Sequence, residues 1–506
     1  MSGSEEDNRE RAGPTERLVG WFDNRLGLSH ELLRPAPRYS INPFYWLGAL
    51  AVVAFIIQGI SGSIMLLYYI PTPSTAYATT LYIFQNVSYG QFLETVHLYT
   101  AYAMIMLAFM HMMRGFFVSV HKKPREVMWV VGMAMGFVTL GFGFTGYLLP
   151  WTVVSYSATK VGTAMIGALP APISSFINFL VVGNGGDAGQ LLRFFDLHVV
   201  VLPAVLLVLL AVKMYMLETH GVSEPVTGGA PDPKKNGRLI PIFPDVSFYL
   251  LELAALFGAA MLLISVLFPL NLQTAYSPAA AAQSVPQPDW YFLWIYQIIK
   301  ISAFEQAGLS AALTFVALIF ILLTILPFID RGKTRRIARR PWYVTIGLVF
   351  IAEVVVLTIW GQKTPGQVIP NTQGILVLGG TALAVCIVSF NVYRLLAKRP
   401  ESTAASVPPS SPKSEASRIH SASVWASAIF VAVLALGAFS MGGLINSIVI
   451  MATFGTSEME LAALAFSLAA LAVAVVGACF LLYRLDLGRG RIKRRVRLFE
   501  VGWKQK

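Results

Sequence analysis

Cysteine is almost absent from this 506-residue chain, and charged residues are scarce. The two cysteines, Cys386 and Cys479, lie in apolar runs without a CxxC or CxxCH pattern. A disulfide framework, an iron–sulfur site and a covalently attached c-type heme are therefore unsupported. Only 13% of the residues are charged, 56% are hydrophobic, and the mean hydropathy is +0.64. A water-soluble fold cannot bury that much apolar surface, so the composition predicts a polytopic membrane protein.

The N-terminal sequence does not have the pattern of a cleaved signal peptide. The first residues, MSGSEEDNRERAGPTER, are acidic and polar, whereas a signal peptide begins with basic residues followed by an apolar run. We expect residues 1–42 to form a cytoplasmic N-terminal tail.

Long apolar segments, by contrast, are abundant, and ten of them reach the length that spans a bilayer. They lie near residues 43–70, 92–119, 127–149, 196–218, 246–269, 309–328, 342–361, 373–396, 422–450 and 460–484. The predicted fold class is an all-α polytopic membrane protein with about ten transmembrane helices.

Lysine and arginine indicate how these segments are oriented. They cluster at 114–125, 234–238, 331–340 and after residue 484, always following an even-numbered segment, which places both termini in the cytoplasm by the positive-inside rule. The net charge of +12 then reflects orientation in the plasma membrane and contact with anionic lipids. No soluble domain remains to bind nucleic acid.

The second apolar segment carries two histidines, His97 and His111. Fourteen residues make close to four helical turns, so both imidazoles leave the same helix face about 21 Å apart. This spacing suits two cofactors stacked through a membrane. The alternative is a pair of histidines satisfied inside a helical bundle.

Four glycines repeat the same interval. Gly48 and Gly62 lie fourteen residues apart in one segment, as do Gly132 and Gly146 in another. Because glycine lets a bulky planar group approach the backbone closely, two helices are predicted to be cut away at the depths of the histidines. Ordinary small-residue helix packing is the alternative.

The fourth segment carries His198 and, fifteen residues later, Lys213. The second and fourth segments run the same way in the predicted topology, so His198 shares the outer depth with His97, and Lys213 the inner depth with His111. Ionisable residues inside a membrane are costly and are functional candidates by default. A lysine that extends to the cytoplasmic face is the alternative for Lys213.

Taken together, these stretches resemble a known family, the cytochrome b subunits of quinol-oxidising respiratory and photosynthetic complexes. The nearest local spacing is that of the cytochrome b-f type, and the chain also resembles cytochrome b-like subunits of archaea from acidic habitats. The resemblance covers residues 40–395 and rests on IQGISGSIMLLYYIPT, the His97/His111 helix, HKKPREVMWVVG, GYLLPW, RFFDLH, PDWY and LPFID.

The resemblance implies two hemes, b-type or a-type, in a four-helix bundle over residues 43–220. His97 and His198 would bind the outer heme, and His111 and Lys213 the inner heme. The other cofactor-binding residues predicted for this bundle are Arg114, Arg193, Gly48, Gly62, Gly132 and Gly146. No third, covalently bound heme is expected, because Trp46 replaces the cysteine that tethers it in the b-f branch.

The resemblance further implies a quinol-oxidation site on the outer side, under short surface helices at 150–190. In PDWY, Asp289 would accept a quinol proton, with Tyr291 beside it, although Asp289 is one methylene shorter than the family's usual glutamate. An aspartate that caps the following helix is the alternative. His220 is predicted at an inner quinone site.

The implied function is transfer of electrons from outer quinol through two hemes to inner quinone, coupled to proton translocation. The expected partners are a Rieske-type iron–sulfur protein or heme–copper oxidase subunits. Residues 221–397 would form the C-terminal domain of the cytochrome, 398–421 a cytoplasmic Pro/Ser-rich linker, and 422–506 two extra helices with a basic tail. A polytopic transporter and a heme-free structural subunit are the other interpretations.

Overall fold

The computed structural model describes residues 35–37, 40–183, 186–221, 223, 239–285, 287–332, 334–335 and 337–397. This part of the chain is almost entirely helical, and its two short strands, β1 (Pro35–Pro37) and β2 (Leu239–Pro241), pair antiparallel with Pro35 opposite Pro241. The predicted tail up to residue 34, the linker 398–421 and the two segments 422–450 and 460–484 lie outside the described residues.

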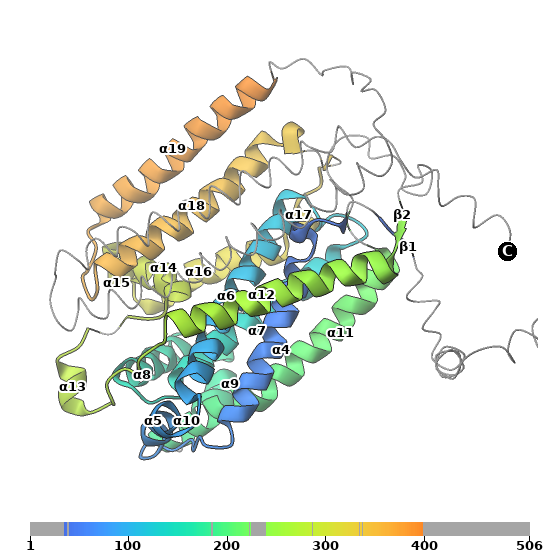
Figure 1. Cartoon of the computed structure of the whole chain (residues 1–506). Helices are drawn as coiled ribbons and strands as arrows, with labels where there is room; N and C mark the ends of the chain where they lie inside the picture. The colour runs from blue at the N-terminus through green and yellow to red at the C-terminus, as the bar shows by residue number, and fades with distance from the viewer. Residues whose placement is uncertain are drawn as a thin grey trace, which may run out of the picture.

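The first half of the chain supplies the following helices, shown in blue to green in Figure 1. They are η2 (Pro43–Tyr45), α4 (Leu47–Met65), α5 (Ala76–Asn86), α6 (Gly90–Phe117), α7 (Glu126–Leu148), α8 (Val153–Gly167), α9 (Ile173–Ile177), η3 (Asn178–Val182), α10 (Gly186–Asp196), η4 (Leu197–Val201) and α11 (Leu202–His220).

The second half supplies the remaining described helices. They are η5 (Ile242–Val246), α12 (Ser247–Leu267), α13 (Pro278–Ala282), α14 (Trp290–Ile299), α15 (Ser302–Ala307), α16 (Leu309–Thr324), α17 (Leu326–Ile329), η6 (Ile337–Arg339), α18 (Pro341–Lys363) and α19 (Asn371–Ala397).

Seven helices in the described part are long and apolar enough to cross a membrane. They are α4, α6, α7, the continuous run α10–η4–α11, α12, α18 and α19. The segment predicted at 309–328 is shorter, because α16 ends at Thr324 and Pro327 lies in the first turn of a separate helix, α17. Proline cannot donate a backbone hydrogen bond and so interrupts a helix. The prediction of an all-α polytopic membrane fold is confirmed.

Helix α6 is the central element of the first half. In the most apolar 18-residue stretch of α6, 50% of the residues are buried. The corresponding share is 6% for the α10–α11 run and for α19. It packs against α4, α7 and α12, and α7 packs in turn against α11 (Figure 1). Buried side chains such as Leu50, Tyr102 and Phe257 join α4, α6 and α12 in one core. The large apolar side chains exposed on the outer helices suit contact with lipid, where helices satisfy their own backbone groups.

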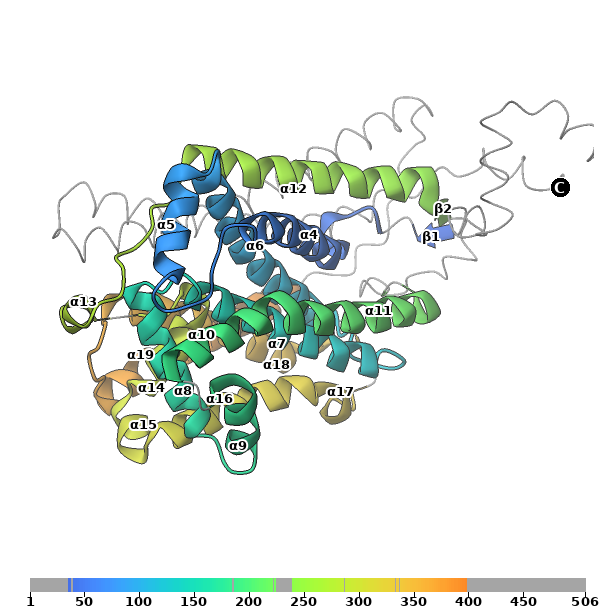
Figure 2. The ribbon, with the colours of Figure 1, turned by 90° about the horizontal axis from the view of Figure 1, so that it is seen from below.

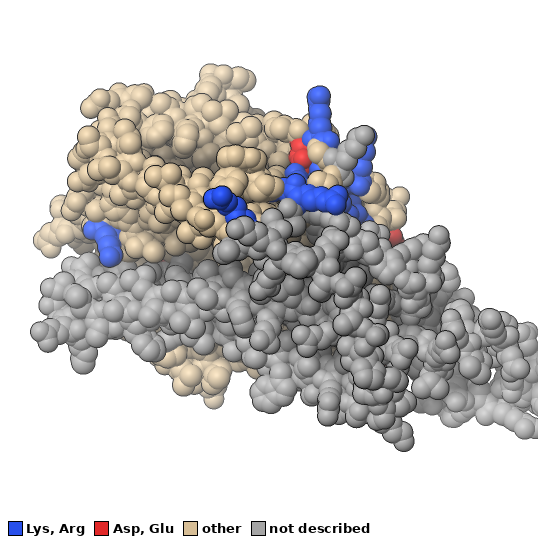
Figure 3. All heavy atoms as spheres, turned by 90° about the horizontal axis from the view of Figure 1, so that it is seen from above, with Lys and Arg blue, Asp and Glu red and all other residues tan. Residues whose placement is uncertain are grey.

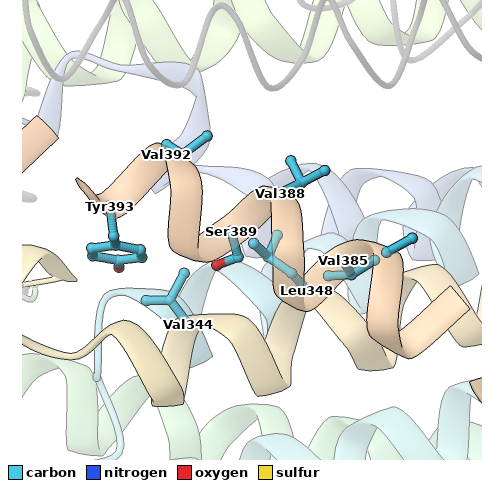
Figure 4. A pocket seen from close by; sticks show the side chains of 8 residues that line it. Val344, Leu348, Val385, Val388, Ser389, Val392 and Tyr393 are labelled. Carbon is cyan, nitrogen blue, oxygen red and sulfur yellow. The ribbon is translucent and has the colours of Figure 1, made fainter. Parts of the chain in front are cut away.

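A second layer of helices lies on the other side of α7. Figure 2 shows α14 and α16 on this side, and α4 and α12 on the opposite side. Trp294, Val316 and Leu357 form the buried cluster that joins α14, α16 and α18. An apolar groove lies between α18 and α19, with Val344 of α18 directed toward Ser389 and Tyr393 of α19 (Figure 4).

Short helices cover one end of the bundle, as predicted for residues 150–190. Figure 1 shows α8, α9 and α10 at this end, together with α5 and α13. Trp151 adopts the left-handed backbone conformation, with φ of 53°, and its carbonyl accepts a hydrogen bond from the Tyr276 amide at 3.2 Å. Thr152 also pairs with Ala275. The segment that precedes PDWY is thereby fixed against GYLLPW.

Two basic loops meet at the opposite end through one aspartate. Asp330 accepts hydrogen bonds from His121 Nε2 at 2.8 Å, Lys122 Nζ at 3.1 Å and Arg340 at 2.5 Å. Figure 3 shows most Lys and Arg side chains of the visible face gathered at this end. These contacts lower the pKa of the Asp330 carboxyl to about 2, although its partial burial acts in the opposite sense. The loops assigned to one membrane side by their charge are thus in direct contact.

Candidate functional site

His97 and His198 face each other between α6 and the α10–α11 run. Their ring centroids are 6.4 Å apart, and the ring planes are inclined by 65°. His97 lies on the regular helix α6, whereas His198 lies in a π-helical turn, η4, immediately before Pro203. A proline inside a helix leaves an earlier carbonyl without its usual donor, and π turns of this kind often carry functional side chains.

A hydroxyl group fixes the orientation of each of these two rings. Ser61 Oγ lies 2.8 Å from His97 Nδ1, and Thr145 Oγ1 lies 3.0 Å from His198 Nδ1. Each hydroxyl donates its single proton to a carbonyl one turn earlier, Ile57 for Ser61 and Gly141 for Thr145. A hydroxyl whose proton is used in this way accepts the proton of Nδ1. This leaves the lone pair of each histidine on Nε2, where a metal can bind.

Each of the four predicted ligands lies against one of the four predicted glycines. A Cβ atom added to the glycine would meet the ligand side chain at 3.3 Å for Gly62 and His97, 2.7 Å for Gly146 and His198, 3.1 Å for Gly48 and His111, and 3.0 Å for Gly132 and Lys213. A Cβ atom at Gly146 would force His198 to move, and at the other three positions it would make an unusually tight contact, so glycine permits the close approach of the ligand side chains.

The inner pair differs from the outer pair in its surroundings. His111 Nδ1 is buried and has no hydrogen-bond partner among the described residues. Lys213 Nζ is directed against Gly132 of α7 rather than along α11 toward its end. Leu47 and Val131 precede the inner glycines, where Ser61 and Thr145 precede the outer ones. The hydroxyl contacts are therefore a property of the outer pair.

A second polar cluster surrounds Asp289, the residue before α14. Tyr102 donates a hydrogen bond to Asp289 Oδ1 at 2.9 Å, and the Tyr291 hydroxyl lies 3.3 Å from Oδ2 and 2.9 Å from the carbonyl of Gly143. Within the described part of the chain, the carboxylate makes no capping bond to the amides of α14. Burial raises the pKa of Asp289 to about 6, while the bonds from Tyr102 and Tyr291 act to lower it.

The other predicted site residues lie further out. Arg114, near the inner end of α6, stacks over the Tyr45 ring with Cζ 3.9 Å from its centroid. Arg193 donates to the carbonyls of Phe179 and Leu180 in the surface segment. His220 is exposed at the end of α11, and its carbonyl accepts a bond from Arg125 at 3.0 Å. Their proposed roles stay predictions.

Three features of this site were not predicted from the sequence. Ser61 and Thr145 each directly precede a spacing glycine, so the dipeptides SG and TG were an available signal. Tyr102 lies on the histidine helix, but no pattern in the sequence indicates that it meets Asp289. Their contacts depend on how α4 and α14 pack against α6 and how α7 packs against η4.

Comparison with known proteins decides the family. Two family models match the chain, cytochrome b(N-terminal)/b6/petB over residues 102–278 and cytochrome b(C-terminal)/b6/petD over residues 278–379. A cytochrome bc complex cytochrome b subunit of Chlorobaculum thiosulfatiphilum is 32% identical over 355 residues, which are 68% of this chain and 80% of that protein. The chain belongs to the cytochrome b family.

Two further similarities support the same family assignment. Cytochrome b of Sulfolobus acidocaldarius is 29% identical over 74% of this chain and 71% of its own length. The solved structure of a hyperthermophilic respiratory Complex III superimposes with a TM-score of 0.61 and 25% identity, over 74% of this chain and 100% of that chain. The family and the apolar helices together establish a multi-pass membrane protein.

The family implies heme, and the outer pair of histidines fits it. Two imidazoles that bind one metal through nitrogens about 2 Å away place their ring centroids roughly 6 to 6.5 Å apart, and the observed separation is 6.4 Å. Each Nδ1 lies within hydrogen-bond distance of a hydroxyl, and a glycine lies against the edge of each ring. A glycine likewise lies against His111 and against Lys213.

Proposed function

We propose that this chain is the diheme cytochrome b subunit of a bc-type complex that oxidises quinol on the outer side of the plasma membrane. His97 and His198 would hold the outer heme, and His111 and Lys213 the inner heme, within a body formed by residues 43–220. When bound, the two hemes supply one-electron carriers at two depths of the membrane. The observation that carries this proposal is the glycine that lies against each of the four ligands.

The outer quinol site is proposed at Asp289 and Tyr291, in the C-terminal domain 221–397. Oxidation of a quinol releases two electrons and two protons, and a carboxylate can take one of those protons. Asp289 is buried next to aromatic side chains that suit a quinol ring, Trp290 and Tyr291. His220 would contribute to an inner quinone site, and Arg114 and Arg193 would compensate heme propionates.

The electron acceptor is proposed to be a partner subunit, either a Rieske-type iron–sulfur protein or a heme–copper oxidase. Transfer of charge between the two sides of the membrane would couple the reaction to proton translocation. The linker 398–421 and the extra helices within 422–506 remain predictions for this part of the chain.

Addition of quinol to the oxidised, purified complex tests the proposal. We expect the visible absorption of reduced low-spin heme to develop in the α-band region as quinol is consumed. A transporter or a heme-free subunit would show no such absorption, with quinol or with a chemical reductant. Heme that is reduced by the chemical reductant but never by quinol would refute the proposed substrate.

Replacing Lys213 should change the coordination of the inner heme. An amine must be neutral to bind iron, and arginine keeps a positive charge but cannot become neutral in a protein. We therefore expect both Lys213→Ala and Lys213→Arg to alter the electron paramagnetic resonance and near-infrared bands of the inner heme. If Lys213 only extends to the membrane surface, Lys213→Arg should preserve the inner heme, which would contradict the ligand assignment.

Removal of the two hydroxyls should raise the reduction potential of the outer heme. A hydrogen bond from Nδ1 makes an imidazole a stronger donor and favours the oxidised metal. A neutral hydrogen bond of about 0.5–1.5 kcal/mol corresponds to roughly 20–60 mV for one electron. Redox titration of Ser61→Ala and Thr145→Val should show this increase, and Ser61→Thr should restore the potential. An equal shift in the inner heme, whose His111 lacks such a bond, would contradict this explanation.

A further inference from the structure

Tyr102 lies on α6, five residues after His97, and its ring is 5% exposed. The Tyr102 side chain belongs to the polar cluster around Asp289. Its ring centroid is 6.2 Å from that of Trp290 and 6.3 Å from that of Tyr291. The helix that carries the proposed ligand His97 is therefore in direct contact with the PDWY segment through the Tyr102 side chain.

The hydroxyl protons of the two tyrosines are used differently. Among the described residues, the Tyr102 hydroxyl has a single acceptor, Asp289 Oδ1 at 2.9 Å. Tyr291 also has one proton, but two acceptors compete for it, the Gly143 carbonyl at 2.9 Å and Asp289 Oδ2 at 3.3 Å. The carbonyl is nearer and can only accept. Tyr102 is thus the donor whose proton is committed to Asp289.

An ionised Asp289 needs such a donor because it is taken out of water. A buried carboxylate is costly unless hydrogen bonds compensate its charge. Among the described residues, the titratable groups that face it are three tyrosines, Tyr102 from α6, Tyr291 from α14 and Tyr147 from α7. A phenol carries no positive charge, so the compensation depends on hydrogen bonding.

We propose that Tyr102 is a positioning residue of the outer quinol site, whose hydroxyl orients the Asp289 carboxylate and keeps it in the ionised form that accepts a proton. This inference rests on the proposed role of Asp289. Asp289 is one methylene shorter than the glutamate usual in the family, and Tyr102 reaches it from the neighbouring helix. The short carboxylate and the tyrosine on α6 thus act as one unit.

Tyr102→Phe removes the hydroxyl and keeps the aromatic packing. A hydrogen bond to a charged acceptor corresponds to a shift of about one to two pH units. Loss of the bond raises the pKa of Asp289, so the increase of quinol oxidation with pH should move to higher pH by that amount. The rate at high pH should be restored, which a general loss of structure would not allow. Tyr99→Phe is the matched control, since Tyr99 is also buried on α6 but donates to the Phe268 carbonyl.

Two further measurements separate this inference from the proposed function. Infrared titration of the whole complex can follow the protonated carboxyl band that Asp289→Asn removes, without any quinol. We expect Tyr102→Phe to shift the titration of this band upward, and to have no effect on the residual pH profile in an Asp289→Asn background. An unshifted band would overturn the role of Tyr102. A shifted band with undiminished turnover in Asp289→Asn would support the contact and refute Asp289 as the base.

Discussion

Replacing His97 or His198 with alanine should remove the outer heme and leave the inner heme in place. Each side chain offers an Nε2 lone pair in the tautomer whose Nδ1 donates to the hydroxyl of Ser61 or Thr145. Either variant would lose one of the two proposed ligands and the side chain that lies against the neighbouring glycine. The reduced-minus-oxidised spectrum of the purified variant should lose one of its two α-band components, and the heme content should fall from two to about one per chain.

His220→Ala is the control for this pair of variants. His220 is exposed at the end of α11, seven residues beyond Lys213, and should be dispensable for both hemes. Retention of both α-band components in His97→Ala and in His198→Ala would show that neither residue is an axial ligand. Loss of both components in either variant would indicate that the bundle fails to assemble, and heme content in His198→Gly with added imidazole then distinguishes ligand loss from misfolding.

Asp289→Asn should lower quinol oxidation by roughly 10²-fold or more, because the amide cannot act as a base. The asparagine keeps the shape of the site and can still accept the bond from Tyr102. In the wild type, burial raises the pKa of Asp289 to about 6, so the ionised, proton-accepting form predominates above that pH. Turnover of the wild type should therefore rise as the pH increases through about 6, and the variant should lose this dependence.

Asp289→Glu tests whether the carboxylate itself is needed. It restores the residue usual in the family and should retain much more activity than Asp289→Asn, with both heme spectra unchanged in either variant. Equal turnover in wild type and Asp289→Asn would mean that the proton leaves quinol by another route, and Asp289 would then be a structural partner of Tyr102.

The histidine and glycine spacings in the sequence were sufficient to predict which of these side chains lie against which glycine. A membrane helix is nearly straight, so an interval of fourteen residues becomes a fixed distance along the axis. The structure accordingly sets each predicted glycine against the predicted ligand at its depth. The positive charge of the loops was similarly informative, since the loops after α6 and α17 meet at Asp330.

Contacts between helices distant in the sequence could not be predicted in the same way. The rotation of α6 about its axis decides whether Tyr102 faces lipid, heme or α14. Because α6 is hydrophobic on all sides, its sequence does not indicate this rotation. His121 shows the same limit, because its position in a loop does not reveal that the folded loop buries it against Trp129 and Asp330. The break at Pro327 was visible in the sequence, but an apolar run on both sides of it suggested one continuous span.

A redox titration of the purified wild-type complex, combined with measurement of heme per chain, tests the central claim most directly. Two ligand pairs at two depths should give two heme centres, each titrating with one electron at its own potential, and two hemes per cytochrome b chain. A single component with one heme per chain would show that only one of the two glycine-lined pairs binds iron. A preparation of intact complex without heme in this chain would contradict the account altogether.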